Sequence, residues 1–368
     1  MWNPKGKKYG LYLEVDDKRG LYMRNMYQLL EMIGNSAGAS NKARADVNYI
    51  ADKIGFETIA VHTPQLSGSI ISKAIGKIGF ERELIRVLKS VSSNGVLLVQ
   101  VPFLNIANRT HKNILDYCSN KNIKVISFIH DVNDLRGTNT KNNQPFYDLL
   151  KYSSAVISHN TRMSEHLLSK GVDPERVINL EIFDYLLDEQ KNVGSFKKEI
   201  VIGGNLDVEK VKYLRQLNLI KGCHIVLYGP NYTINESSDH IEYKGVVEAA
   251  KLPSMLNEGF GLVWDGDSID SCTGRYGNYL KFNNPHKLSM YIASGLPVII
   301  WDQAAEAEFV RKSGIGITVG SLMDLESVFD CMKENEYKQF TDNIKGFQNK
   351  LITGFYARKA IEEALKLL

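Results

Sequence analysis

Cysteine is scarce in this 368-residue chain, and long apolar runs are missing from it. The four cysteines form no Cys-x-x-Cys pair and no cluster with histidine, so neither a disulfide framework nor a zinc site is indicated. No apolar run approaches the roughly 20 residues of a membrane-spanning helix. The polar start, Met1–Gly10, lacks the apolar segment of a signal peptide. We therefore expect a cytoplasmic protein in a reducing compartment.

Excess charge is also lacking, since the formal net charge is only +3. So small an excess does not indicate nucleic acid, and we expect no nucleic-acid partner. One stretch, Ile70–Ser92, is locally basic. Its cations are Lys73, Lys77, Arg82, Arg86 and Lys89. The stretch is either a solvated helix face or a peripheral contact with anionic lipid, and both readings stay open, as does homo-oligomer formation.

Strand-like and helix-like segments alternate along two parts of the chain, each long enough for a domain. The first part covers residues 26–185 and the second covers residues 199–352, with a polar linker, 186–198, between them. Such alternation is typical of a parallel sheet with helices on both faces, so we predict two doubly wound α/β domains. Residues 1–25 are interpreted as an N-terminal extension or hairpin.

Several local expectations follow from the spacing of apolar residues. Residues 207–217 and 248–256 are predicted to be helices, and residues 265–277 are predicted to be a long loop. Gly76 and Gly79 are candidate breaks in the helical stretch at residues 70–92.

The most informative stretch is Tyr279–Trp301. A polar loop, Asn283–Lys287, leads into a helix that ends at Ser294-Gly295, and a short apolar strand, Val298–Trp301, follows. The free N–H groups and the dipole at the start of a helix, with Lys287 in its first turn, favour an anion such as phosphate. The alternative is an ordinary helix–strand unit in which Lys287 is only solvated.

The string NNPHKLSMYIASGLPVI within this stretch resembles the nucleotide-binding segment of GT-B glycosyltransferases. It is most similar to the bacterial group that contains the glucosyltransferase of serine-rich adhesins and the β-1,6-galactofuranosyltransferases. The resemblance implies two Rossmann-like domains facing a central cleft, a UDP-sugar donor, and a glycan, glycolipid or glycoprotein acceptor. It also implies that a terminal helix, residues 353–368, crosses back onto the first domain.

The candidate donor site lies at the strand ends of the second domain. The N–H groups of Gly203 and Gly204 are expected to face a diphosphate, and Tyr228 is expected to stack on a base or bond its ribose. The full set is Gly203, Gly204, Asn205, Tyr228, Gly229, Asn283, Asn284, Lys287 and Glu306. For Glu306 the resemblance implies contact with the ribose or the donor sugar, and an exposed helix glutamate is the alternative.

No metal and no other cofactor are expected. Asp265-Gly266-Asp267 has the letters of a metal-binding DxD motif, but it lies in a loop of the second domain. The resembling enzymes generally hold the diphosphate with helix dipoles and basic residues.

The first domain is expected to supply the general base and the acceptor side of the site. His130-Asp131 follows a strand, so either the imidazole with Asp131 orienting it, or Asp131 directly, is the candidate catalytic base. The alternative is that Asp131 caps a turn and His130 packs. The acceptor-side candidates are Asn35, Ser36, Gly38, Gln100, His159 and Asn160.

Together these features predict a hexosyltransferase of the glucose or galactofuranose class, acting in glycan or polysaccharide assembly, inverting and metal-independent. Two alternatives stay open. One is an isomerase of the same architecture, such as a UDP-sugar 2-epimerase. The other is a non-catalytic subunit that binds a nucleotide sugar.

Overall fold

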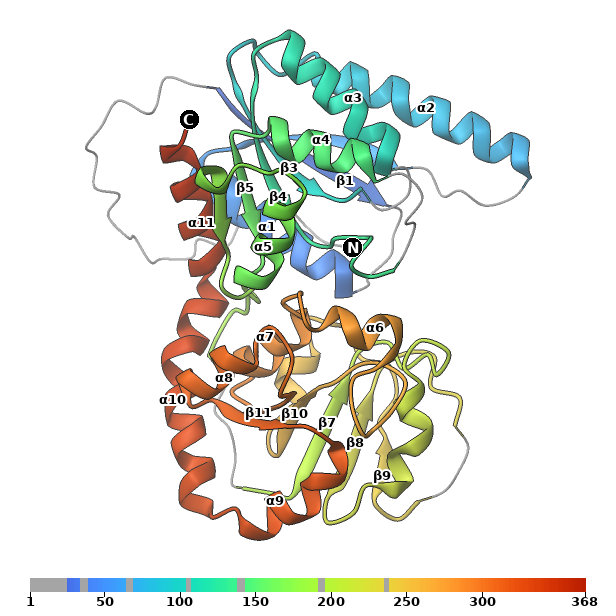
Figure 1. Ribbon diagram of the computed structural model, residues 1–368, viewed down its shortest axis with the longest axis vertical. Helices are drawn as coiled ribbons and strands as arrows, with labels where there is room; N and C mark the ends of the chain where they lie inside the picture. The colour runs from blue at the N-terminus through green and yellow to red at the C-terminus, as the bar shows by residue number, and fades with distance from the viewer. Residues whose placement is uncertain are drawn as a thin grey trace.

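The computed structural model describes residues 25–33, 39–63, 69–103, 107–137, 143–190, 196–234 and 238–368. Two α/β domains lie one above the other, and two long helices run along one side of both (Figure 1). Residues 1–24 of the expected extension lie outside the described residues, as do Asn35, Ser36 and Gly38.

The first domain is built on a six-stranded sheet in which every strand pair is parallel, in the order β2-β1-β3-β4-β5-β6. Its strands are β1 (Met26–Ile33), β2 (Glu57–Thr63), β3 (Val96–Val101), β4 (Lys124–Ile129), β5 (Ala155–Ser158) and β6 (Val177–Asn179). Every residue of β3 is buried, because helices cover both faces of a parallel sheet. The strand order reverses between β1 and β3.

The helices of this domain are α1 (Ala39–Ile54), α2 (Ile70–Leu88), α3 (Ala107–Asn120), α4 (Gln144–Tyr152), α5 (Thr161–Ser169) and the 3₁₀ helix η1 (Pro174–Arg176). Helix α2 is continuous, so the suggested break at Gly76 and Gly79 is wrong. An isolated glycine lowers helix stability without ending the helix.

The second domain has a parallel sheet in the order β12-β11-β10-β7-β8-β9. Its strands are β7 (Glu199–Gly203), β8 (His224–Tyr228), β9 (Ile241–Tyr243), β10 (Phe260–Val263), β11 (Val298–Trp301) and β12 (Gly316–Val319). Counted within the domain, this is the 3-2-1-4-5-6 order of a dinucleotide-binding fold. The order reverses between β7 and β10, and ligands of such sheets bind beyond the strand ends at that point.

The short helices of this domain are η2 (Lys212–Leu219), η3 (Leu252–Met255), α6 (Gly274–Tyr279), α7 (His286–Ala293), α8 (Ala307–Ser313), η4 (Leu322–Asp324) and α9 (Leu325–Cys331). Three local predictions are wrong. The predicted helix at 207–217 is a 3₁₀ helix that starts later, because the Tyr213 N–H donates to the Gly266 carbonyl instead of the preceding turn. The predicted helix at 248–256 shrinks to η3, where Pro253 has no N–H to donate. The predicted loop at 265–277 is too long, because its last residues, from Gly274 on, belong to α6.

Two helices end the chain, α10 (Glu334–Thr353) and α11 (Phe355–Lys366). Helix α10 packs on α7 in the second domain, whereas α11 packs on α1, β5 and β6 in the first. The chain turns between them at Gly354, where the backbone is left-handed and a Cβ would lie 2.7 Å from Ile50. The Asp184 carboxylate accepts the N–H groups of Tyr356 and Ala357 (3.1 and 2.6 Å) and so caps α11. No helix in the described ranges has the length and apolar character needed to cross a membrane.

Candidate active site

The first turn of α7 lies beside the ends of β10 and β7, at the reversal point of the second sheet. Pro285 precedes the helix, so its missing N–H costs nothing there. The Lys287 ammonium donates to the Asp265 carboxylate (3.0 Å) and to the Trp264 carbonyl (3.1 Å). These bonds hold a cation, 22% exposed, next to the positive end of a helix dipole.

Three buried polar atoms, two in the loop before α7 and one in its first residue, have no hydrogen-bond partner. They are Oδ1 of Asn283, Oδ1 of Asn284 and Nε2 of His286. Because buried polar groups in folded proteins are nearly always bonded, such a group of unpaired atoms suits a polar ligand or bound water.

The two glycines at the end of β7 do not have the role that the sequence suggested. The Gly203 N–H donates to the Tyr291 hydroxyl (2.8 Å), and the Gly204 N–H donates to the Tyr228 carbonyl (3.0 Å). The expectation that both N–H groups are open to a diphosphate is therefore wrong. Gly229 serves packing as well, since a Cβ there would lie 1.7 Å from the Gly204 carbonyl oxygen.

Tyr228 and Asn205 also differ from expectation. Tyr228 is 7% exposed and belongs to the hydrophobic core, so its ring offers no open stacking surface. The Asn205 side-chain oxygen accepts the Asp207 N–H (3.1 Å) and the Asn231 amide (2.9 Å), which shapes the exposed loop after β7.

Glu306 is buried, at 3% exposure, so the alternative of an exposed helix glutamate is wrong. Its carboxyl accepts the side-chain amide of Asn160 from the first domain (2.9 Å), and burial raises the pKa of Glu306 to about 8. Asn160 also donates to the Phe282 carbonyl (3.1 Å) and caps α5 by accepting the Met163 N–H. Asn160 thus joins the two domains.

His159 makes a second link between the domains. Its Nδ1 accepts the Asn284 N–H (2.9 Å), and its Nε2 lies 3.1 Å from the Ile129 carbonyl, so the ring is held in one neutral tautomer. Burial lowers the pKa of His159 to about 4. His159 and Asn160, predicted to line the acceptor side, both form hydrogen bonds across the contact between the two domains.

His130 is positioned by Gln100. The Gln100 amide donates to Asn48 (2.7 Å), so its oxygen accepts the Nε2–H of His130 (2.6 Å) and leaves Nδ1 of His130 with the lone pair. The ring stacks on Phe183 at 5.5 Å. Burial, with the charge of Arg44, holds the pKa of His130 well below its ordinary value.

Asp131 has different partners from His130, so the predicted arrangement in which Asp131 orients the imidazole is wrong. The Asp131 carboxylate accepts from Arg136 (2.8 Å) and from the Tyr279 hydroxyl, which itself accepts the Val132 N–H (3.0 Å). Burial raises the pKa of Asp131, and the charge of Arg136 opposes that shift. The carboxylate remains 32% exposed.

The carboxylates of the Asp265-Gly266-Asp267 sequence are engaged by two different lysines. Asp265 pairs with Lys287 (3.0 Å) and Asp267 with Lys212 (3.5 Å). In the described residues, no group of three or more His, Cys, Asp or Glu side chains is arranged to hold a metal ion.

Sequence reasoning missed Arg136, Tyr279 and Arg275. Tyr279 comes from the second domain but packs in the core of the first, and Arg275 donates to the Arg136 carbonyl (2.9 Å). No local pattern distinguishes Tyr279 and Arg275, because their partners Val132 and Arg136 lie more than 130 positions away in the sequence.

A small cavity in the first domain was missed as well. It is lined by Pro102, His111, Asn133, Asn143 and Phe146. Both ring nitrogens of His111 and the side-chain amide nitrogen of Asn143 are buried without partners. Burial lowers the pKa of His111 to about 3, so the ring is neutral and can both donate and accept a hydrogen bond.

Comparison with known proteins places the chain in a family. The glucosyltransferase 3-like N-terminal domain matches residues 26–182, and the glucosyltransferase 3-like C-terminal domain matches residues 200–364. The β-1,6-galactofuranosyltransferase WbbI of Escherichia coli K12 is 33% identical over 352 residues, covering 92% of this chain and 98% of that protein. Glucosyltransferase 3 of Streptococcus gordonii is 24% identical, covering 93% and 98%.

Solved structures agree on the fold. HepE of Anabaena, in complex with UDP and glucose, has a TM-score of 0.62 at 11% identity, covering 93% of this chain and 100% of that one. The lipopolysaccharide outer core galactosyltransferase WaaB has a TM-score of 0.54 at 12% identity, covering 92% and 99%. The two facing Rossmann-like domains are therefore the GT-B architecture that the resemblance implied. With both domains matched and a relative aligned along nearly its whole length, this chain belongs to the glucosyltransferase 3-like family of GT-B glycosyltransferases.

Proposed function

We propose that this protein moves a hexose from a UDP-sugar to a carbohydrate acceptor, with inversion at the anomeric carbon and without a metal ion. The observation that carries the proposal is the group of unpaired polar atoms in the residues that directly precede Lys287 at the start of α7. It lies at the reversal point of the second sheet, where such folds bind nucleotides.

The chemistry of that group suits a nucleoside diphosphate. The first N–H groups of α7 have no acceptor within the helix, and together with Lys287 they favour an anion. The side-chain oxygens of Asn283 and Asn284 can accept from hydroxyl or N–H groups of a nucleoside or sugar. The Lys287 charge offsets the negative charge that develops on UDP as it leaves.

Asp131 is proposed as the general base. The acceptor hydroxyl oxygen forms a bond to the anomeric carbon while the bond from that carbon to the UDP oxygen breaks. The hydroxyl proton passes to the Asp131 carboxylate. The Asp131 carboxylate is 32% exposed, and burial raises its pKa, which makes it a stronger base than an ordinary aspartate. His130, with its depressed pKa, contributes through packing.

Glucose and galactofuranose are the sugars to test first, because the relatives are named for glucosyl and galactofuranosyl transfer. The experiment measures UDP release from UDP-glucose and UDP-galactofuranose, with and without glycan acceptors and with EDTA present. The expected result is release that requires an acceptor, together with a lengthened glycan. Conversion of the UDP-sugar to an epimer without release would favour the isomerase, and tight binding without turnover would favour the binding subunit.

A further inference from the structure

We propose that the solvent face of α2 docks the protein on an anionic lipid surface. The face is defined by five exposed residues of α2 and by the residue directly after the helix. They are Ile75, Ile78, Arg82, Ile85, Arg86 and Lys89. The three isoleucines are 65%, 50% and 42% exposed, which is unusual for side chains so apolar.

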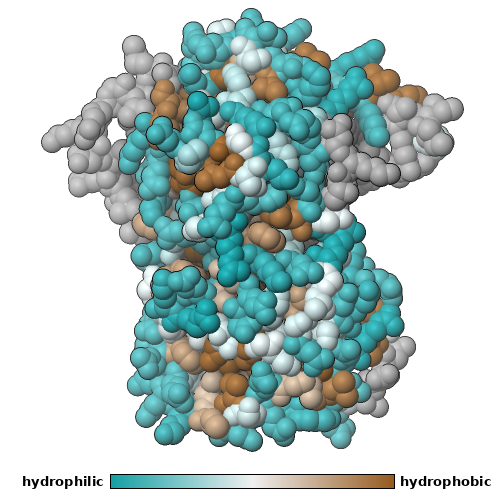
Figure 2. All heavy atoms as spheres, viewed as in Figure 1, coloured by the Kyte–Doolittle hydropathy of each residue, from teal (hydrophilic) through white to brown (hydrophobic). Residues whose placement is uncertain are grey.

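These residues share one face because their spacing follows the helical repeat. At 3.6 residues per turn, all six positions fall within about a third of the helix circumference. The opposite side carries Phe80, Leu84 and Leu88, which are buried in the first domain. Figure 1 shows α2 along the outer side of this domain with its N-terminal end projecting beyond the neighbouring helices. In Figure 2 hydrophobic and hydrophilic side chains alternate over that region.

The face carries three cations and no carboxylate. The acidic residues of α2 lie at its flanks and are engaged there, Glu81 with Arg109 (2.7 Å) and Glu83 with His62 (2.9 Å). No ion pair within 4.0 Å joins Arg82, Arg86 or Lys89 to a carboxylate in the described part of the chain, although the charge of Arg86 acts on the nearby Glu83 and helps to lower its pKa. The positive charge of the face is therefore offset only in part within this domain.

Among the occupants of such a face, an anionic bilayer fits best. A second copy docking through the same face would place three cations against three cations, because a two-fold contact pairs a surface with itself. An acidic protein surface would pair with the three cations but would not account for the three exposed isoleucines. At a bilayer the cations meet phosphate headgroups while the isoleucines enter the boundary with the acyl chains.

Docking of this kind goes beyond the proposed transferase activity and does not depend on it. If the transfer proposal also holds, the first domain would be held near acceptors that sit on a membrane. The test uses binding alone, so its failure is distinguishable from failure of the proposed function.

The experiment is co-flotation of the full-length protein with vesicles of phosphatidylcholine alone or mixed with phosphatidylglycerol. We expect flotation only with the anionic vesicles, weakened by added salt. Replacing Arg82, Arg86 and Lys89 with Gln should abolish it, since each cation near the surface contributes roughly fivefold in affinity. Replacing Ile75, Ile78 and Ile85 with Ser should weaken it while keeping the salt dependence.

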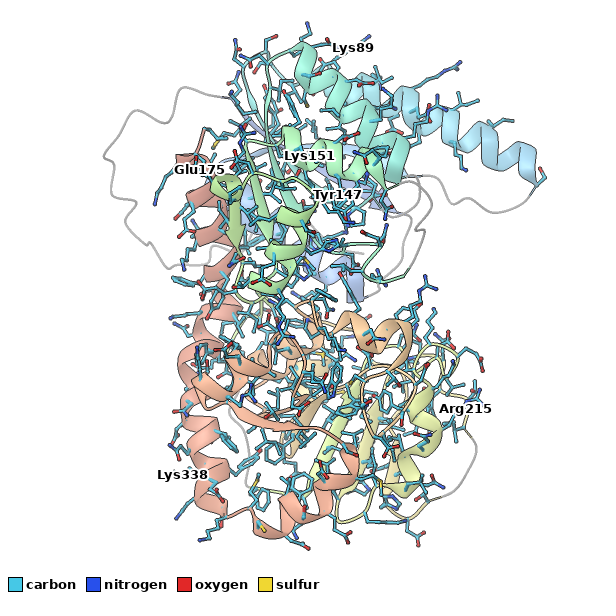
Figure 3. The ribbon with its side chains drawn as sticks, in the orientation of Figure 1. Lys89, Tyr147, Lys151, Glu175, Arg215 and Lys338 are labelled. Carbon is cyan, nitrogen blue, oxygen red and sulfur yellow. The ribbon has the colours of Figure 1, made fainter. Side chains whose placement is uncertain are left out.

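The matched control replaces three exposed lysines of the second domain, Lys221, Lys312 and Lys338, with Gln. It removes the same charge and should float like the wild type. Lys338 lies on α10, in the other domain (Figure 3). Absence of flotation with anionic vesicles, or an equal loss in the control, would overturn the proposal. Two other results would also overturn it. One is a dimer, measured by light scattering, that dissociates in the serine variant. The other is binding to an acidic protein without binding to vesicles.

Discussion

Asp131 combines partial exposure with a carboxylate held by Arg136 and Tyr279, and this makes it the residue on which the proposed chemistry depends. Replacing Asp131 with Asn keeps the shape but removes the proton acceptor. We expect kcat to fall by about 10²–10⁴-fold, the usual contribution of a positioned base, with UDP affinity nearly unchanged. Steady-state kinetics and calorimetry measure the two quantities.

The matched control is Asp116→Asn, on the exposed side of α3, where Asp116 only pairs with Lys112. It should keep wild-type kcat. Wild-type kcat in the Asp131 variant would refute the assignment. Three other ionisable side chains that could serve as a base are already engaged, because Asp184 caps α11, Glu181 pairs with Lys359 and His159 accepts the Asn284 N–H. A His130 base with an ordinary pKa would make the rate fall near pH 6–7, and the depressed pKa of His130 means that no such fall is expected.

Glu306 gives a prediction about stability and pH. Its pKa of about 8 in the folded protein is above its ordinary value of 4.5, because burial disfavours the charge. The stabilisation from the protonated carboxyl is therefore complete below pH 4.5 and is lost as the pH rises through 8. Relative to Glu306→Gln, which stays neutral, the wild type should lose a few kcal/mol between pH 5 and pH 8.5. Urea unfolding of both proteins at each pH measures this, and parallel curves would show that Glu306 does not titrate in this range.

At the scale of elements, the start of α5 joins the domains through one side chain. Asn160 caps α5 and donates to Glu306 and to the Phe282 carbonyl. Asn160→Ala should reduce the free energy of unfolding by roughly 2–4 kcal/mol, the sum of a lost cap and unpaired buried acceptors. Asn349→Ala, on the exposed side of α10, is the control and should be neutral. Equal midpoints of urea unfolding for the two variants would contradict the joining role.

The elements also explain which predictions succeeded. The buried strand β11 is a continuous apolar run, and β3 is apolar except for Gln100. Helix α7 has a proline at its start and Ser-Gly at its end, so local sequence predicts all three elements. The predicted helix at 207–217 failed because the Tyr213 N–H bonds to a distant carbonyl, at Gly266, which no local pattern announces. The prediction that Gly203 and Gly204 bind the diphosphate failed for the same reason. Their N–H groups donate to the Tyr291 hydroxyl and to the Tyr228 carbonyl.

At the scale of the whole molecule, the alternation of strands and helices predicted two domains and the resemblance predicted the GT-B family. The contact between the domains could not be predicted. His159 and Asn160 were correctly placed after a strand, but their partners belong to the other domain. Such pairs depend on how the surfaces of the two folded domains pack against each other. For that reason the hydrogen bonds of His159 and Asn160 across the domain contact could not be predicted.

The central claim is that a UDP-sugar binds at the start of α7 through Lys287 without a metal ion. Calorimetric titration of UDP in EDTA tests it most directly, in the wild type, Lys287→Ala and Asp265→Asn. Both variants break the same ion pair, but only the first removes the cation. We predict binding to the wild type, a roughly ten- to 150-fold loss in Lys287→Ala, and no loss in Asp265→Asn. Equal affinity in wild type and Lys287→Ala, equal loss in both variants, or binding only after Mg²⁺ or Mn²⁺ is added would contradict the account.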